Sequence, residues 1–222
     1  MSQAPRQIIA IIPALNESAH LGSVLSTLPG VITKVIVVDD GSTDGTGTLA
    51  QKQGAYVIRH EHSQGYDASL NEGFVHAQQL GADIFVTFDA DGEHHPEDIA
   101  AVLAPILASQ ADIVVGTRPT LMHAAEKIFA LYTTLRFKVA DPLCGLKAYT
   151  RDVYERVGAF DTVHSIGTEL MIRGKRAGFR LMAVPIRRGE RVLGDSSRFY
   201  CHALRANMKV LSAFMRILPF TL

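Results

Sequence analysis

The sequence has few cysteines, no tryptophan and no long apolar run. Its two cysteines, Cys144 and Cys201, are too few for a disulfide scaffold or a Cys₄ zinc site, which favours a reduced, cytosolic setting. No apolar stretch approaches the roughly 18 residues of a membrane-spanning helix, and the first residues show no signal-peptide pattern. We therefore expect a cytoplasmic protein that is at most peripheral to the inner face of the cell membrane.

The chain also lacks a net charge, but only because two opposite charges cancel. Lys plus Arg and Asp plus Glu each number 22 among 222 residues. Residues 1–116, the acidic part, hold 4 basic and 14 acidic side chains, a net of −10. Residues 117–222, the basic part, hold 18 basic and 8 acidic side chains, a net of +10. The basic part favours an anionic binding partner, and the apolar content of 47% excludes a disordered chain.

Short runs that are apolar throughout alternate with helix-length segments in the acidic part. Such runs suit strands that are buried on both faces of a parallel sheet. We expect strands at residues 8–12, 35–38, 55–58, 84–88 and 113–115, and helices at 17–28, 44–53, 66–80 and 96–109. This order predicts an α/β fold with a doubly wound, mostly parallel sheet flanked by helices.

The pattern changes in the basic part. We expect helices at 122–139 and 166–177, a loop at 141–145, a strand at 180–185, a basic loop at 187–198 and a last helix from about 200 to 218. No repeat, low-complexity tract or long linker separates the two parts. Residues 1–199 are therefore expected to form one domain, with residues 200–222 as a C-terminal helical appendage.

An acidic turn follows the strand expected at 84–88. In extended chain, residues two apart point the same way, so Asp89, Asp91 and Glu93 can present oxygens toward one point. Oxygen ligands suit Mg²⁺ or Mn²⁺, which one or two carboxylates and substrate phosphates often hold. The alternative is an ordinary Asp/Gly turn after a strand.

Polar residues follow two other expected strands. Either Asp39 or Asp40 is placed to accept hydrogen bonds from a nucleobase or ribose, whereas Asp44 suits a helix cap. Glu17 is either a ribose acceptor or an acid that the helix dipole favours in a first turn. Because ligands of doubly wound sheets bind outside the carboxyl ends of the strands, we expect these residues to converge on one rim.

Several well-known motifs are missing. No G-x-G-x-x-G follows the first strand and no complete phosphate-binding loop occurs, which excludes a standard dinucleotide or P-loop site. Neither H-E-x-x-H nor G-x-S-x-G is found. The pairs His60/His62 and His94/His95 have too few partners at suitable spacing for a zinc site.

Taken together, the motifs resemble those of the family 2 glycosyltransferases of the GT-A fold. The resemblance rests on Pro13–Glu17, Val38–Thr46, Asp89–Gly92, Val115–Arg118, Asp141–Tyr149, Glu169 and Gly194–Arg198. The later motifs are similar to those of the dolichyl-phosphate mannose synthase branch, which glycosylates polyprenyl phosphates. The resemblance implies a metal-dependent, inverting transfer of a hexose from a nucleoside-diphosphate sugar to a polyprenyl phosphate. It implies no nucleic-acid partner.

The resemblance also implies roles for individual residues. Residues 1–116 would bind the nucleotide and residues 117–199 the acceptor. The nucleotide would contact Pro13, Ala14, Leu15, Glu17, Asp40, Gly65, Asp89 and Ala90. The metal, Mg²⁺ or Mn²⁺, would be held by Asp89, Asp91 and Glu93, of which Asp91 is central to catalysis. Arg118 and Arg198 would contact phosphates.

The chain departs from the branch at three places. Glu93 stands where the branch usually has Gln. The run Gln64–Leu70 lacks a usual Lys and gains Asp67, and Leu146-Lys147 replaces a usual Phe-Arg. These departures bear on the sugar and the acceptor and leave the reaction class unchanged.

The acceptor decides whether a catalytic base is needed. A phosphate is already anionic near neutral pH, because its second pKa is about 6. A saccharide hydroxyl, as in cell-envelope polysaccharide synthesis, would need a base, and Asp141 and Glu169 are the candidates. Both also have a structural interpretation, Asp141 before a Pro turn and Glu169 in a helix's first turn. A non-catalytic nucleotide-sugar-binding subunit is the alternative from another class.

The last expected helix is amphipathic. An apolar row comprises Leu204, Met208, Leu211, Met215 and Leu218, and a mostly basic row beside it comprises Arg205, Lys209, Ser212 and Arg216. This pattern suits an interfacial helix with basic side chains at lipid headgroups. Packing on its own domain, or on a partner subunit in a homo-oligomer, is the alternative.

Overall fold

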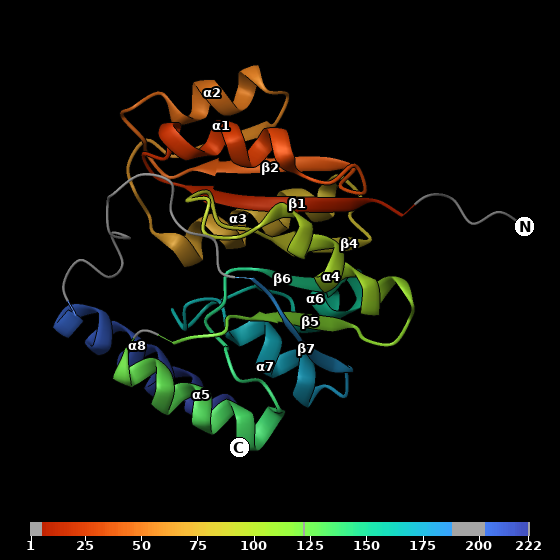
Figure 1. Cartoon of the computed structure of the whole chain (residues 1–222), viewed down its shortest axis with the longest axis vertical. Coiled ribbons are helices and arrows are strands. Elements are labelled where there is room, and N and C mark those ends of the chain that lie inside the picture. Colours follow the sequence, from red (N-terminus) through yellow and green to blue (C-terminus); the bar gives the residue numbers. More distant parts are fainter. Residues whose placement is uncertain (1–5, 122, 188–202, 222) are drawn as a thin grey trace, which may run out of the picture.

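The computed structural model describes residues 6–121, 123–187 and 203–221, and its centre is one seven-stranded sheet (Figure 1). The strands lie in the order β3-β2-β1-β4-β6-β5-β7. Their bounds are β1 Ile8–Ala14, β2 Lys34–Asp39, β3 Tyr56–Arg59, β4 Ile84–Thr87, β5 Ile113–Thr117, β6 Lys147–Thr150 and β7 Leu181–Pro185. The helices are α1 Ser18–Thr27, α2 Thr46–Lys52, α3 Tyr66–Gln79, α4 Pro96–Leu107, α5 Ala124–Phe137, α6 Arg151–Val157, α7 Glu169–Arg176 and α8 Ala203–Ile217, followed by the short 3₁₀ helix η1 Leu218–Phe220.

The five strands expected in the acidic part all form. β1 pairs in parallel with β2 and with β4, and β2 pairs in parallel with β3. The apolar run Ile8–Ile12 in β1 is buried on both faces, as its continuous apolar pattern predicts. Helix α3 packs on β1 and β2, and α4 packs on β5 and β6. The α/β fold with a mostly parallel sheet flanked by helices is therefore confirmed.

The sequence pattern missed β6 and the helix α6 that follows it. β6 runs antiparallel to both of its neighbours, β4 and β5. It has four residues, one of them Lys147, so no apolar run marked it as a strand. Lys147 is nevertheless buried. A strand from the basic part thus lies between two strands from the acidic part.

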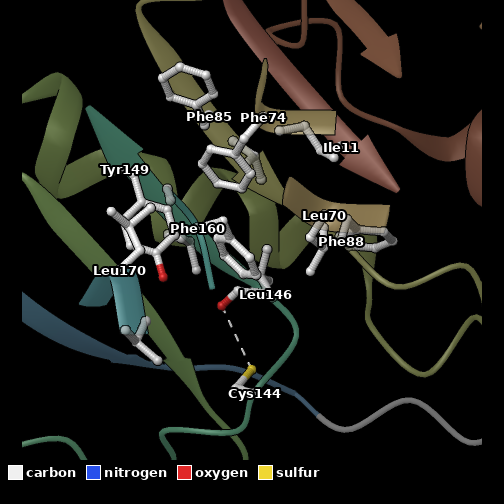
Figure 2. Close-up of a cluster of buried hydrophobic side chains, with 14 of the residues drawn as sticks. Ile11, Leu70, Phe74, Phe85, Phe88, Cys144, Leu146, Tyr149, Phe160 and Leu170 are labelled. Atoms are coloured by element: carbon white, nitrogen blue, oxygen red, sulfur yellow. Dashed lines mark hydrogen bonds between the residues drawn. The ribbon is translucent and has the colours of Figure 1, made fainter. Parts of the chain in front are cut away.

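One aromatic cluster joins the two parts of the chain in the core (Figure 2). The Phe74 ring of α3 stacks on Phe85 of β4 and on Phe160, with centroids 5.0 and 4.8 Å apart. Tyr149 of β6 meets Phe74 edge-on at 5.9 Å. Such pairs stabilise a fold beyond the area they bury, by about 0.5–1.5 kcal/mol each. The acidic and basic parts therefore share one core.

Helices α5 and α8 lie side by side at the margin of the molecule, away from β1, β2 and β3 (Figure 1). The Ala125 amide donates to the Asn207 side chain (2.9 Å), Phe129 packs on Phe214, and the Tyr132 hydroxyl donates to Thr221. The residue numbers of the partners increase together along both segments, so the two helices run parallel. Within the described residues, no helix has the length and apolarity needed to cross a membrane.

Candidate active site

The turns after β1 and β2 are tied together at the carboxyl edge of the sheet. The Asn16 amide donates to Ser42 Oγ (2.8 Å), and the Thr43 amide donates to Asn16 Oδ1 (2.7 Å). The Glu17 amide donates to Thr46 Oγ1 (2.9 Å). Asn16 has a φ of 52°, a conformation that asparagine tolerates better than most residues. Two of the proposed nucleotide-binding segments are thereby fixed on one rim.

The residues expected to contact the nucleotide reach this edge from several elements. Pro13 and Ala14 end β1, Leu15 follows it, and Gly65 immediately precedes α3. The Glu17 carboxylate is 3.1 Å from His20 Nδ1, within the start of α1. Asp89 and the buried Ala90 follow β4. The expected convergence of strand ends is thus present, although the edge is also held by hydrogen bonds between the turns.

Asp40 is buried and uses its whole carboxylate within the protein. Oδ1 accepts from His60 Nδ1 (2.6 Å) and the Gln64 amide (2.7 Å), and Oδ2 accepts from Ser63 Oγ (2.6 Å) and the Gly65 amide (2.9 Å). Burial raises the pKa of Asp40, but these hydrogen bonds outweigh it and hold the pKa below its usual value. A carboxylate accepts about four hydrogen bonds, so Asp40 holds the turn that leads into α3.

Asp39, its neighbour, is less completely paired. Oδ1 accepts from the Ser42 amide (2.9 Å), while Oδ2 is buried without a hydrogen-bond partner among the described residues. A Cβ at Gly47 would lie 2.3 Å from that oxygen. Arg59 Nε lies 3.7 Å from the same oxygen, so Asp39 Oδ2 has an ion-pair partner without a hydrogen bond.

His60 connects β3's end to helix α3. Its Nδ1 meets Asp40 and its Nε2 is 2.7 Å from Glu72 Oε2. With a carboxylate at each ring nitrogen, both nitrogens donate when the ring is protonated. Burial lowers the pKa of His60, but the hydrogen bonds to Asp40 and Glu72 outweigh it and raise the pKa above its usual value. The sequence showed this histidine only as one of a pair.

Asp89 is fixed from three sides after β4. Tyr66 Oη donates to Oδ1 (3.3 Å), and His94 Nε2 is 3.2 Å from Oδ2. A Cβ at Gly145 would lie 1.8 Å from Oδ2, so this position tolerates glycine alone while Asp89 keeps its place. The neighbouring Cys144 thiol donates to the Leu146 carbonyl (3.7 Å; Figure 2). Burial raises the pKa of Cys144 to about 12, so this thiol is structural.

The surroundings of Asp89 and Asp91 shift the pKa values of the two carboxyl groups in opposite directions. Burial raises the pKa of Asp89, but the hydrogen bond from His94 and the positive charges of His94, Arg118 and Lys147 bring it below its usual value. Burial, together with the negative charge of Asp89, raises the pKa of Asp91 to about 6. Two crowded carboxylates of this kind fit a divalent cation, which would relieve their repulsion.

The three proposed metal ligands share one turn without forming a compact cluster. The Glu93 amide donates to Asp91 Oδ1 (3.0 Å), which orients Asp91. Within the part of the chain that the structure describes, no group of three or more His, Cys, Asp or Glu side chains is arranged to hold a metal ion. A cation held at this turn would therefore need further ligands, such as the oxygens of a bound diphosphate.

Arg118 and Asp141 form a bidentate ion pair beside this turn. Arg118 Nε donates to Asp141 Oδ2 (2.7 Å) and Nη2 donates to Oδ1 (3.0 Å). The Arg118 amide also donates to Oδ2 (3.2 Å). Asp141 is fully buried, whereas the Arg118 side chain is 14% exposed. The geometry supports the structural interpretation of Asp141, as the residue that orients Arg118.

Glu169 is likewise engaged within the protein. It is fully buried in the first turn of α7. Its carboxylate accepts from the Thr162 amide and hydroxyl and from Arg173 Nη1 (2.7 Å). The geometry again supports the structural interpretation, because this carboxylate fastens the loop before α7.

Lys147 adds a buried positive charge that the sequence pattern marked only as a departure. Its Nζ donates to the Gly167 carbonyl (2.7 Å). Burial lowers the pKa of Lys147, an effect that the negative charges of Asp141 and Asp89 oppose. Only the fold reveals its neighbours, because β6 was not predicted. Arg198 and the motif Gly194–Arg198 lie outside the described residues.

Comparison with known proteins identifies the family. The model of glycosyl transferase family 2 matches residues 9–209. A polyprenol monophosphomannose synthase of Mycolicibacterium smegmatis is 31% identical, over 92% of this chain and 86% of that protein. A UDP-N-acetylglucosamine–dolichyl-phosphate N-acetylglucosaminyltransferase of Methanococcus voltae is 30% identical, over 83% of this chain and 86% of that protein.

A solved structure supports the fold independently. Glucosyl-3-phosphoglycerate synthase from Mycobacterium tuberculosis, in complex with Mn²⁺ and uridine-diphosphate-glucose, superposes with a TM-score of 0.71. It is 22% identical and the match covers 95% of this chain and 79% of that one. At this identity the likeness shows the GT-A fold alone. The chain belongs to glycosyl transferase family 2, in the branch that resembles the dolichyl-phosphate mannose synthases, and it is a glycosyltransferase.

Proposed function

We propose that this enzyme transfers a hexose from a nucleoside-diphosphate sugar to a polyprenyl phosphate, with inversion and with Mg²⁺ or Mn²⁺. The single observation that carries the proposal is the crowded pair Asp89 and Asp91, with the cations Arg118 and Lys147 beside it. Such a site suits a diphosphate leaving group and an anionic acceptor. The names of the two relatives described above support the polyprenyl phosphate.

The nucleotide would lie along the rim formed by the turns after β1, β2 and β4. Pro13, Ala14, Leu15, Glu17, Asp40, Gly65, Asp89 and Ala90 stay the proposed contacts. Within this set, Asp40 would act by holding the turn at Gln64 and Gly65, because its four acceptor positions are filled. Asp39 adds a buried carboxylate close by, whose Oδ2 is paired with Arg59 without a hydrogen bond.

Asp89 and Asp91 would hold the divalent cation, with Glu93 as a further oxygen at the same turn. When bound, the cation supplies a Lewis acid that neutralises charge on the leaving diphosphate. Tyr66 and His94 fix the Asp89 carboxylate, and the Glu93 amide fixes that of Asp91. The protein thereby prepares the carboxylate geometry before the donor arrives.

Arg118 would contact a phosphate, oriented by Asp141, and Arg198 would contribute a second phosphate contact. A phosphate acceptor needs no proton removed, because it is already anionic near neutral pH. It attacks the anomeric carbon opposite the leaving diphosphate, which inverts the configuration. This reaction needs neither Asp141 nor Glu169 as a base. Asp141 is already paired with Arg118, and Glu169 already accepts hydrogen bonds from Thr162 and Arg173.

A lipid-linked acceptor places the enzyme at a membrane. We therefore propose a cytoplasmic protein in peripheral contact with the inner face of the cell membrane, through the segment 200–222. The basic residues Arg205, Lys209 and Arg216 on the described part of that segment support this location.

The decisive experiment is a donor screen. Release of nucleoside diphosphate is measured for several nucleotide sugars, with and without polyprenyl phosphate and Mn²⁺. Turnover that requires polyprenyl phosphate is expected. Turnover onto a soluble saccharide without the lipid would contradict the proposed acceptor, and nucleotide-sugar binding without turnover would favour a non-catalytic subunit.

Asp91→Asn tests the metal assignment. The loss of a ligand charge is expected to lower transfer about a hundredfold or more and to weaken Mn²⁺ binding measured by calorimetry with the nucleoside diphosphate. The matched control is Asp152→Asn, the same change at an exposed position on α6, which should retain activity within a few-fold. Unchanged transfer in Asp91→Asn would show that the metal assignment is wrong.

A further inference from the structure

His60 is a buried histidine at the nucleotide rim to which the proposed reaction gives no task. It directly follows β3, and its side chain is 4% exposed. Its amide donates to the Asp39 carbonyl (2.9 Å), and its Nδ1 lies 2.6 Å from Asp40 Oδ1. Backbone and side chain therefore both attach His60 to the end of β2, next to the turn proposed to meet the nucleotide.

The Asp40 carboxylate joins the turn after β2 to the loop before α3. Besides His60, it accepts hydrogen bonds from the Ser63 hydroxyl (2.6 Å) and the Gly65 amide (2.9 Å). The two segments are also in direct contact, because a Cβ at Gly41 would lie 2.9 Å from the Ser63 nitrogen. The position of Gly65 therefore depends on how the Asp40 carboxylate is held.

Gly65 connects this loop to the carboxylates proposed to hold the metal. Its backbone has φ 97° and ψ 168°, a region open essentially to glycine alone. Helix α3 begins at the next residue, Tyr66, whose hydroxyl donates to Asp89 Oδ1 (3.3 Å). A displacement of Gly65 would therefore alter both a proposed nucleotide contact and a hydrogen bond that fixes Asp89.

The second ring nitrogen of His60 faces α3 itself. Nε2 lies 2.7 Å from Glu72 Oε2, on the second turn of that helix. The Glu72 side chain is 40% exposed, whereas that of Asp40 is 6% exposed. A protonated ring donates to both carboxylates. If the ring loses one proton, Nδ1 keeps its hydrogen, because Glu72 can turn toward water and the buried Asp40 cannot.

We infer that His60 is a positioning residue for donor binding, because its Nδ1–H holds Asp40 and Asp40 holds the Gly65 turn that meets the nucleotide. His60 acts through Asp40 and touches no reacting atom. Its contribution is therefore expected in the affinity for the nucleoside diphosphate and its metal, and not in the rate of transfer from the bound donor. The inference rests on the proposed function for the place of the nucleotide on this rim.

Two substitutions separate the two ring nitrogens. The amide nitrogen of an asparagine side chain stands close to the position of Nδ1, whereas that of glutamine reaches the position of Nε2. His60→Asn therefore keeps a donor for Asp40, and His60→Gln moves the donor toward Glu72. We expect His60→Gln to bind the donor about tenfold more weakly and His60→Asn to stay within about threefold of the unaltered chain. If His60 only filled space, the smaller asparagine would be the more harmful change.

Calorimetry with uridine diphosphate and with guanosine diphosphate, each in the presence of Mn²⁺, measures this affinity without the acceptor. Steady-state transfer assays give the donor KM and kcat of the same variants. The donor KM of His60→Gln should rise about tenfold, while kcat at saturating donor stays within about twofold. A merely structural role would lower the amount of active enzyme, and hence kcat, without changing KM.

The matched control is His62→Gln, which makes the same change at an exposed position two residues further along the loop. It should bind the diphosphate like the unaltered chain, and thermal melts verify that the variants fold. The inference is overturned if His60→Gln binds the diphosphate within about twofold of this control. It is also overturned if His60→Asn binds more weakly than His60→Gln.

Nitrogen NMR of the unaltered chain, labelled with ¹⁵N-histidine, tests the same hydrogen bond without any variant. Nδ1 of His60 is expected to carry a proton between about pH 6 and 9, on both sides of the usual pKa of histidine. Its signal should shift when the diphosphate is added with Mg²⁺. An Nδ1 without a proton over this range would overturn the inference.

The outcomes for His60 and for the proposed function differ. Binding of the diphosphate without transfer to polyprenyl phosphate would contradict the proposed function, and the order of the two His60 variants would still decide this inference. Transfer to polyprenyl phosphate with equal donor KM in His60→Gln and His62→Gln would do the reverse. A chain that neither binds a diphosphate nor transfers a sugar would contradict both.

Discussion

At the scale of single residues, the site depends on how little space surrounds Asp89. Its carboxylate fits between Tyr66, His94 and the backbone of Gly145. Sequence reasoning found Asp89 because an acid after a buried strand is visible in the pattern. It did not find Tyr66 or the task of His94, because a sequence shows residue types and not the partners that folding brings to them.

Gly145→Ala is expected to displace Asp89 and to lower transfer about a hundredfold, since a misplacement of about 1 Å can have that effect. The new Cβ would lie 1.8 Å from the present position of Asp89 Oδ2. Steady-state kinetics with the donor and acceptor measure the effect. The control is Gly30→Ala, where no atom lies within 4 Å of the added Cβ. Activity of Gly145→Ala within a few-fold of the control would contradict this account of the site.

Asp67 shows how one departure from the branch affects stability. Burial, together with the charge of Asp161, raises the pKa of Asp67 to about 6, against the hydrogen bond from the Gly167 amide. A carboxyl group whose pKa is raised by folding destabilises the folded state once it ionises. This loss in the free energy of unfolding begins near pH 4, the unfolded pKa, is complete slightly above pH 6, and remains at higher pH. The sequence showed the acid, and the fold supplies the burial.

Asp67→Asn is therefore expected to increase the free energy of unfolding by up to about 3 kcal/mol at pH 7.5, and by much less at pH 4. Urea unfolding at the two pH values measures the difference. Asp152→Asn, at an exposed position on α6, should change stability by less than about 0.5 kcal/mol at either pH. A stabilisation by Asp67→Asn that is the same at pH 4 and pH 7.5 would disagree with the raised pKa.

At the scale of elements, the predicted strands and helices of the acidic part are close to those observed, because each strand is an uninterrupted apolar run. β6 could not be found in this way, since it begins with Lys147, has only four residues and pairs with strands distant in sequence. Asp44 was expected to cap one helix. The structure instead has Gly45 at the N-cap of α2 and Glu17 at that of α1. Asp44 lies one residue before Gly45, where its Oδ2 accepts from the Ser18 amide of α1 and its Oδ1 accepts from the Thr46 amide of α2.

Asp44→Ala is expected to lower the free energy of unfolding by about 1–2 kcal/mol at pH 7, because the first amides of α1 and α2 lose a charged acceptor. Burial raises the pKa of Asp44, but hydrogen bonds from Thr46 and Ser18 bring it to about 2. Its contribution is therefore complete above the unfolded pKa near 4 and disappears as the pH falls toward 2. Urea titrations of both chains should converge at low pH. The control, Glu61→Ala, removes an exposed loop acid. A loss as large as that of Asp44→Ala would contradict the role of the Asp44 hydrogen bonds at the two helix starts.

At the scale of the whole molecule, the opposite charges of the two parts meet inside one fold. Arg151 pairs with Asp83 (3.0 Å), and Arg180 pairs with Asp112 (2.7 Å). The charge asymmetry predicted an anionic partner for residues 117–222. Some of these basic side chains instead pair with acidic side chains of residues 1–116 in the same fold. Exposed pairs of this kind contribute little to stability individually. Composition gave the asymmetry, but it could not divide the basic residues between internal pairs and ligand contacts.

The shared sheet leads to a prediction for the isolated acidic part. In a chain of residues 1–116, β4 would lose its antiparallel neighbour β6, and β5 would lose both β6 and β7. Phe74 would lose the ring contacts with Phe160 and Tyr149, and Phe85 would lose that with Tyr154. The fragment would also keep its net charge of −10 without the basic residues that oppose it. The fragment is therefore expected to show no cooperative urea transition by circular dichroism, while the full chain unfolds in one. A cooperative transition in the fragment near the midpoint of the full chain would mean that the acidic part folds by itself. Strand β6 would then be an addition to a domain that is already folded. The position of Asp89 against Gly145 would depend on the contact between two folded units. Gly145→Ala would then weaken that contact without unfolding either unit.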